Sequence, residues 1–130
     1  MVLRRAPIVL ALLLVGCPGT LDEGEFGDGG DPTCPDVPMF LATRCATAGC
    51  HTSMFPAGLL DLQSPNVGSR VIGVMSTCGG PLGDPNNPDK SIVIKKLTGN
   101  QCGTRMPLNL PALSSGEISC IQAWIAGGGK

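Results

Sequence analysis

Seven cysteines are spread over the 130 residues of this chain, and they constrain its fold more than any other feature. Cys17 directly follows an apolar N-terminal stretch, and the other six lie further along the chain. In that later part the only aromatic side chains beyond residue 35 are Phe40, Phe55 and Trp124, so the hydrophobic core is small. Domains of this size usually need disulfides, a metal or a cofactor for stability. We therefore expect the six cysteines to supply that support.

The N-terminal residues 1–16 have the pattern of an export signal. Two arginines precede an apolar run over residues 8–15, which ends at Gly16 directly before Cys17. The run is about half as long as the roughly 20 residues that a membrane-spanning helix needs, and no later segment is longer. The Leu-Val-Gly-Cys segment that ends at Cys17 resembles the lipobox of bacterial lipoproteins, which implies a lipidated Cys17. In the alternative, the signal is an ordinary secretory one and Cys17 is a spare thiol, and export is predicted in both cases.

The segment 17–35 is predicted to be a lipidated, disordered tether. It is rich in Gly, Asp, Glu, Pro and Thr and has too few apolar residues to form a core. Six of the ten acidic residues lie between Asp22 and Asp36, so the rest of the domain that follows, residues 36–130, is net positive by three from Val37 onward. That charge is too small, and the aromatic content too low, for a nucleic-acid-binding domain. It can still steer the domain toward an acidic partner protein.

Three helices are predicted for the domain from capping patterns and apolar periodicity. Asp36, with an early proline, starts a helix that runs to Cys45. The segment 90–97 is apolar enough for a strand, but its boundaries favour a helix. The strongest pattern is the capping box of Ser114 and Glu117, after which isoleucines recur at helical spacing until the glycines from residue 127 end the helix.

The remaining segments are predicted to be short or irregular. Ser64-Pro65 opens a short helix that runs to Val71. Residues 58–62 form a connecting loop with inward-pointing leucines, and the Gly-, Pro- and Asn-rich residues 78–89 form a loop. The fold class expected from these patterns is mainly α, a small helical domain with long loops.

One motif places two thiols and an imidazole within seven residues, Cys45-Ala-Thr-Ala-Gly-Cys50-His51. It resembles a c-type haem attachment site, in which both cysteines form thioethers with the haem and the adjoining histidine becomes an axial ligand of the iron. The usual motif has two residues between the cysteines, whereas this chain has four, all of them small; spacings of four occur among multihaem cytochromes. The seven residues alone also allow an alternative in which Cys45 and Cys50 form disulfides and His51 is a surface histidine.

Met106-Pro107, about 55 residues after His51, resembles the Met-Pro that supplies the second axial ligand in small cytochromes c. Phe40 and Trp124 match the paired terminal helices that close over the haem in that fold. The order of these pieces over residues 37–129 is similar to the cytochrome c-like domains of planctomycete and myxobacterial lipoproteins. The resemblance implies one haem c, ligated by His51 and Met106.

The other four cysteines, Cys34, Cys78, Cys102 and Cys120, allow three disulfide pairings. We favour Cys78 with Cys102, which would clamp the long loop before the methionine. We also favour Cys34 with Cys120, which would tie the end of the tether to the last helix. Each such bridge typically contributes about 2 to 4 kcal/mol to the stability of a small domain.

The leading hypothesis is therefore a one-electron carrier with one haem c. It would be held in the cell envelope by its lipid anchor, facing the periplasm or the exterior, and would exchange electrons with redox partner proteins there. No enzymatic activity is predicted, because no catalytic set of residues is present in the sequence. Nucleic-acid binding is not predicted either. The alternative is a haem-free, disulfide-stabilised surface lipoprotein that acts as an interaction module. A third hypothesis is a copper site built from thiols, His51 and a methionine.

Overall fold

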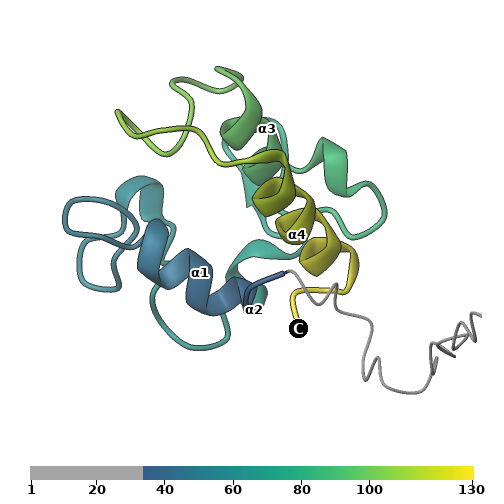
Figure 1. The fold of residues 1–130 in the computed structure, drawn as a ribbon, viewed down its shortest axis with the longest axis horizontal. Coiled ribbons are helices and arrows are strands. Elements are labelled where there is room, and N and C mark those ends of the chain that lie inside the picture. The colour runs from purple at the N-terminus through teal and green to yellow at the C-terminus, as the bar shows by residue number, and fades with distance from the viewer. Residues whose placement is uncertain (1–33) are drawn as a thin grey trace, which may run out of the picture.

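The structure is a computed structural model that describes residues 34–130. The expected signal segment, the lipidation site Cys17 and the tether up to residue 33 lie outside the described residues. In chain order the elements are α1 (Val37–Arg44), η2 (Ala57–Leu59), α2 (Gly68–Val71), β1 (Met75–Ser76), β2 (Gly80–Pro81), η3 (Pro88–Lys90), α3 (Ile92–Thr98) and α4 (Ser115–Ala126), where η denotes a 3-10 helix (Figure 1).

The expectation of a mainly α domain holds only in part. α- and 3-10 helices account for 38% of the described residues and β-structure for 8%, so more than half of the described chain is turn and loop. The strands β1 and β2 form a small antiparallel hairpin in which Met75 faces Pro81 and Ser76 faces Gly80. Within the described residues no helix has the length and apolar character that crossing a bilayer requires.

The first and last helices begin at the residues predicted for them. The side chain of Asp36 accepts a hydrogen bond of 2.7 Å from the backbone N–H of Met39 and so caps α1. At α4 the predicted capping box is confirmed: Glu117 N–H donates to Ser114 Oγ at 3.2 Å, and Ser114 N–H donates to the Glu117 carboxylate at 2.7 Å. Each cap satisfies backbone donors that have no partner inside the helix, which typically stabilises by about 1 kcal/mol.

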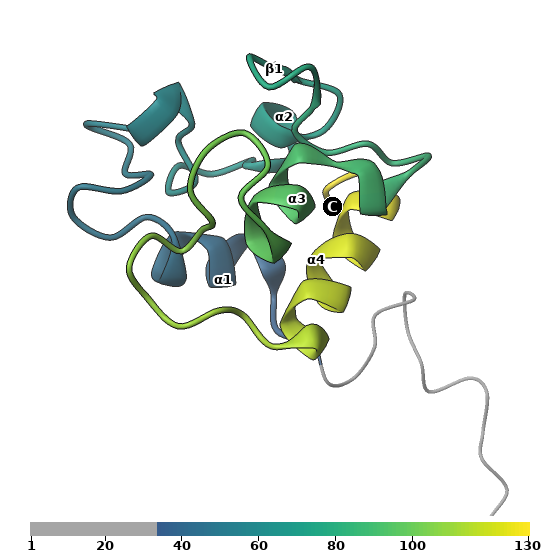
Figure 2. The same cartoon turned by 90° about the horizontal axis from the view of Figure 1, so that it is seen from above.

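The core is built around α4, which packs against both α1 and α3 (Figure 2). Ile121 and Ile125 of α4 are almost completely buried, and Trp124 beside them is 7% exposed. A disulfide joins Cys34, just before α1, to Cys120 in α4, with 5.5 Å between their Cα atoms. This is one of the two pairings favoured from the sequence. It ties the start of the described chain to the last helix.

The segment between α1 and α3 departs from the predicted elements. The helix expected to start at Ser64 begins at Gly68 instead, because Asn66 has a left-handed backbone with φ of 61°, which interrupts a helix. The loop expected over residues 58–62 overlaps the short η2 helix, Ala57–Leu59. Its leucines do not all point inward, since Leu59 is 93% exposed and Leu62 is 7% exposed.

The segment predicted as a loop over residues 78–89 also contains regular structure at both ends. Gly80 pairs within the β1–β2 hairpin, and η3 starts at Pro88. The helix expected over 90–97 is confirmed as α3, but it begins after Ser91 rather than at a cap by Asp89. The hydroxyl of the buried Ser91 accepts a hydrogen bond of 2.8 Å from Asp84 N–H, which holds the preceding loop against the helix.

Candidate functional site

A cavity of about 760 Å³ opens between the segment that follows α1 and the loop that follows α3. In Figures 1 and 2 these two segments, blue and lime, extend on the same side of the domain. The lining combines residues of α1, η2, α2, β1 and α3 with the loop after α3. No residue of α4 is among the lining residues in the described part of the chain, so α4 supports these elements from behind. All four residues predicted to hold a haem line this cavity: Cys45, Cys50, His51 and Met106.

The segment from Cys45 to His51 is a compact turn at the end of α1. Cys45 occupies the C-terminal cap of the helix and donates its N–H to Leu41 O at 2.9 Å. His51 N–H then donates back to Cys45 O at 3.1 Å, which closes the turn. Inside it Cys50 N–H donates to Thr47 O at 2.9 Å, and Gly49 adopts the left-handed conformation that this reversal requires. The four residues between the cysteines are therefore accommodated as a turn, and both thiols still reach the cavity.

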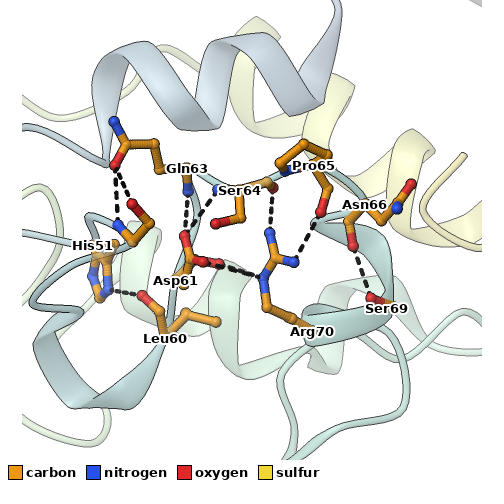
Figure 3. Close-up of polar contacts among 10 residues, drawn as sticks. His51, Leu60, Asp61, Gln63, Ser64, Pro65, Asn66, Ser69 and Arg70 are labelled. Carbon is orange, nitrogen blue, oxygen red and sulfur yellow. Dashed lines mark hydrogen bonds and ion pairs between the residues drawn. The ribbon is translucent and has the colours of Figure 1, made fainter.

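The imidazole of His51 is oriented by a backbone carbonyl. Its Nδ1 lies 3.0 Å from Leu60 O (Figure 3). A carbonyl oxygen only accepts hydrogen bonds, so Nδ1 must carry the proton and the neutral ring keeps Nε2 free as a ligand atom. The backbone of His51 is held by the same segment, because Leu62 N–H donates to His51 O at 3.0 Å. Metal-binding histidines are commonly oriented by such a second hydrogen bond.

Cys45 and Cys50 are free thiols within the described part of the chain, whereas the other four cysteines there are paired. Burial raises the pKa of the Cys45 thiol, and the nearby positive charge of Arg44 opposes this only in part. Thr47 Oγ1 donates to Cys50 Sγ at 3.4 Å. Both thiols are half-buried beside the cavity, which keeps them accessible to a group bound there.

Met106 stands on the loop after α3 and is half-buried. Its N–H donates to Lys96 O at 2.7 Å, which fixes this part of the loop to α3. The ammonium of Lys96 also donates to Cys102 O at 3.0 Å and Thr104 O at 2.7 Å. Arg105 holds the other side of the loop through Leu110 O at 3.1 Å. The loop is thus fastened on both sides of the methionine.

The second disulfide joins Cys78, just after β1, to Cys102 in the same loop, with 5.5 Å between their Cα atoms. This is the other pairing favoured from the sequence, so both predicted disulfides are confirmed. Both of its cysteines line the cavity. The bridge therefore clamps the Met106 loop to the β1–β2 hairpin, the role predicted for it.

The charged groups that line the cavity are all positive: Arg44, Arg70 and Lys96. Arg70 and Lys96 already donate to backbone carbonyl oxygens, whereas Arg44 lies 5.8 Å from the ring centre of Phe40. No carboxylate is among the lining residues that the structure describes. The charge around the cavity is therefore positive, which favours a ligand with negative charge.

The rim of the cavity is unusually apolar for a protein surface. Eight large hydrophobic residues of the described chain are exposed, and five of them line this cavity. These five are Leu59, Val74, Met75, Leu108 and Leu110. Exposed apolar side chains gathered around one hollow indicate a surface that is covered when a ligand or partner is bound.

Other residues singled out in the sequence lie elsewhere. Phe40 and Trp124 pack in or against the core and are not among the cavity-lining residues. The two terminal helices that carry them, α1 and α4, contact each other. Met39 and Met54 are also not among the lining residues, but Met75 of β1 is. Sequence reasoning missed Met75 at the cavity, because an isolated methionine in a short strand has no motif around it.

Within residues 34–130, no group of three His, Cys, Asp or Glu side chains is placed to share a metal ion. Cys45, Cys50 and His51 are accordingly not grouped as three ligands around one point. No family model matches the chain, and no curated protein or solved structure matches it either.

Proposed function

We propose that this chain is an exported lipoprotein that carries one covalently attached c-type haem and transfers single electrons in the cell envelope. The observation that carries the proposal is the convergence of Cys45, Cys50, His51 and Met106 on one apolar cavity, although they span more than 60 positions of the chain. The fold proposed for the domain is a cytochrome c-like one.

The residues around the cavity fit a haem in chemistry and size. The cavity of about 760 Å³ is within the usual range for cofactor and small-molecule sites. Its apolar lining suits the porphyrin, and its positive groups suit the two carboxylates of a haem. Cys45 and Cys50 offer free thiols for thioether bonds. In the neutral form of His51 the ligand atom is Nε2, because Nδ1 donates to Leu60 O.

His51 and Met106 would hold the iron from two walls of the cavity, His51 from the turn after α1 and Met106 from the loop after α3. A haem supplies reversible one-electron chemistry, and a thioether ligand favours its reduced state. The rest of the chain fixes the two ligands: the Leu60 carbonyl orients the imidazole, and the Cys78–Cys102 bridge holds the methionine loop. Because His51 and Met106 would both be iron ligands, the proposed role is a carrier of electrons rather than an enzyme.

The proposed setting follows from the N-terminal segment and the surface of the domain. A lipidated Cys17 would hold the protein at a membrane, and the proposed redox partners would be cell-envelope proteins. Arg44 and the exposed apolar residues at the cavity rim provide a face on which such a partner could approach the haem edge. Nucleic acid is not among the proposed partners.

The test is expression of the full chain with a cytochrome c maturation system, followed by a haem stain of the denatured protein. We expect the wild type to stain and to gain the mass of one haem, and the Cys50→Ala variant to lose or greatly weaken attachment. The matched control is the double variant Cys78→Ala/Cys102→Ala. It removes two other cavity cysteines and should still attach haem.

The alternative of a haem-free interaction module is favoured by one observation, the exposed apolar rim of the cavity. That hypothesis requires all six domain cysteines to be paired, whereas Cys45 and Cys50 are free thiols in this structure. The colour of attached haem, read together with alkylation of the denatured, unreduced protein, separates the two hypotheses. A colourless product without reactive thiols at Cys45 and Cys50 would contradict the haem proposal and support the module.

A further inference from the structure

We propose that Arg70 is a positioning residue for His51: it fixes the segment whose carbonyl orients the imidazole. This inference deepens the proposed function and rests on it for its redox consequence. The observations are the contacts of Figure 3, in which Arg70 and His51 contact the same segment, residues 60–65. Nothing in the sequence pattern around Arg70 indicates such a role.

The guanidinium of Arg70 binds three backbone carbonyls of one bend. Its Nε donates to Asp61 O at 2.8 Å and one terminal nitrogen donates to Pro65 O at 2.9 Å, while the other donates to Ser64 O. The planar fork of an arginine can reach three such acceptors at once, which a lysine ammonium on a flexible stem does not reproduce. Each of the three guanidinium nitrogens thus donates to the protein backbone, so Arg70 affects the cavity through the segment that it fixes.

The carboxylate of Asp61 fixes the same bend from inside. Its Oδ1 accepts from Gln63 N–H at 2.8 Å and Ser64 N–H at 3.0 Å, and its Oδ2 lies 4.0 Å from the Nε of Arg70. Hydrogen bonds from Ser64, with the positive charge of Arg70 as a weaker contribution, hold the pKa of Asp61 below its usual range. The Asp61 carboxylate therefore stays charged at neutral pH and keeps its hydrogen bonds to the backbone of the bend.

On its other side the bend contacts His51 at two points and Ser53 at a third. Leu60 O accepts from Nδ1 of the imidazole, Leu62 N–H donates to His51 O, and Gln63 Oε1 accepts from Ser53 N–H at 3.0 Å. The Asp61 carbonyl that Arg70 binds belongs to the peptide unit directly after the Leu60 carbonyl. A chain of direct contacts thus connects the guanidinium to the imidazole through one short piece of backbone.

This arrangement has a defined chemical consequence for an iron ligand. A hydrogen bond from Nδ1–H to a fixed carbonyl makes the imidazole a stronger donor, which stabilises the ferric state. When the carbonyl is free to move, the bond weakens, the ferric state loses part of this stabilisation, and the reduction potential rises. A tenfold change in the relative stability of the two oxidation states corresponds to about 59 mV for a one-electron couple.

The experiment compares wild type, Arg70→Gln and Arg70→Lys in the haem-loaded full chain. His51 is the only histidine of the chain, so its Nδ1–H gives a single imidazole resonance in the ferrous protein. We expect Arg70→Gln to raise the potential by up to about 59 mV, a tenfold effect, and to speed solvent exchange of Nδ1–H at least tenfold. Arg70→Lys keeps the charge and should raise the potential and speed the exchange by less. If Arg70→Gln does not fold, Arg70→Lys is used for the comparison instead.

The matched control is Arg105→Gln, which removes another arginine that donates to two backbone carbonyls, but on the Met106 loop. It should leave exchange of the His51 Nδ1–H unchanged. Wild-type exchange and potential in a folded Arg70 variant would overturn the inference. So would an equal acceleration in Arg105→Gln, because the effect would then be general loosening.

Failure of the proposed function would be separable from failure of this inference. If the chain carries no haem, the tautomer of His51 in the folded haem-free protein becomes the readout at alkaline pH, where imidazole is neutral. The wild type should then carry its proton on Nδ1, and Arg70→Gln should move part of the population to Nε2. An unchanged tautomer in the folded variant would overturn the role of Arg70 whether or not the haem proposal stands.

Discussion

Removal of the Cys34–Cys120 disulfide should destabilise the domain more than removal of the Cys78–Cys102 disulfide. The first closes a loop with a sequence separation of 86 residues and the second a loop of 24. If a disulfide acts by limiting the unfolded chain, these separations correspond to about 4.6 and about 3.4 kcal/mol at 25 °C. Cys120 is also only 7% exposed, so its replacement adds a packing loss that the exposed Cys102 does not.

The assay is urea unfolding followed by far-ultraviolet circular dichroism, which reports the loss of the helices. The double variants Cys34→Ala/Cys120→Ala and Cys78→Ala/Cys102→Ala are compared with the wild type at the same haem loading. Natural domains are stable by only about 5 to 15 kcal/mol, so the first variant should be close to its unfolding threshold at 37 °C. The second should remain folded with a clearly lower urea midpoint.

A loss below about 2 kcal/mol for the Cys34/Cys120 variant would refute the reasoning, since that is the lower end of the usual disulfide contribution. A smaller loss than for the Cys78/Cys102 variant would refute it as well. Either result would mean that the core around α4, rather than the covalent link, holds the start of the described chain in place.

Three further predictions concern the ligand, the anchor and acid stability. Met106→Ala should leave haem attached, but it should lower the reduction potential and let carbon monoxide bind the ferrous form. Met75→Ala, which changes the other methionine at the cavity, should do neither. Spectroscopic titration with carbon monoxide measures this, and the reverse result would identify Met75 as the ligand. Cys17→Ser should leave the protein exported but move it from the membrane fraction to the soluble fraction, and a wild type already extractable by high salt would contradict lipidation at Cys17. Hydrogen bonds from Ser64 to Asp61 and from Ser114 to Glu117 lower the pKa of both carboxyls in the folded protein. The stability that these carboxylates give to the fold is therefore complete above their ordinary pKa values of 3.8 and 4.5. It is lost as the pH falls through their lower pKa values in the folded protein. Acid unfolding of Asp61→Asn and Glu117→Gln should accordingly show a weaker pH dependence in this range, and an unchanged acid limb would contradict the assignment.

The parts of the fold that were predictable from the sequence are those encoded by local chemistry. A capping box needs only Ser114 and Glu117 at the right spacing, and the structure forms both of its hydrogen bonds. Asp36 before an early proline likewise marked the start of α1. The disulfide pairing was favoured because four cysteines allow only three combinations, and these two bridges would clamp the loop before Met106 and tie the end of the tether to the last helix.

The parts that were not predictable depend on backbone groups or on distant contacts. The carbonyl of Leu60 orients His51, but every residue has a carbonyl, so no sequence pattern marks this one. The short α2 was predicted four residues too long, because the left-handed Asn66 and the carbonyls bound by Arg70 replace a first helical turn. Met75 reaches the cavity only because the β1–β2 hairpin folds toward it, and a hairpin of two-residue strands leaves no periodicity to detect.

The position of the Cys34–Cys120 bridge also determines how the domain carries mechanical load. Cys34 is the first residue that the structure describes, and the bond joins it to the middle of α4. Tension applied to the chain ahead of Cys34 would pass through the sulfur atoms into the most deeply packed helix and bypass α1. The turn that carries Cys45 and His51 follows α1, so it lies off this force path. A domain tethered at its N-terminal side could thus be pulled while its cavity stays undistorted.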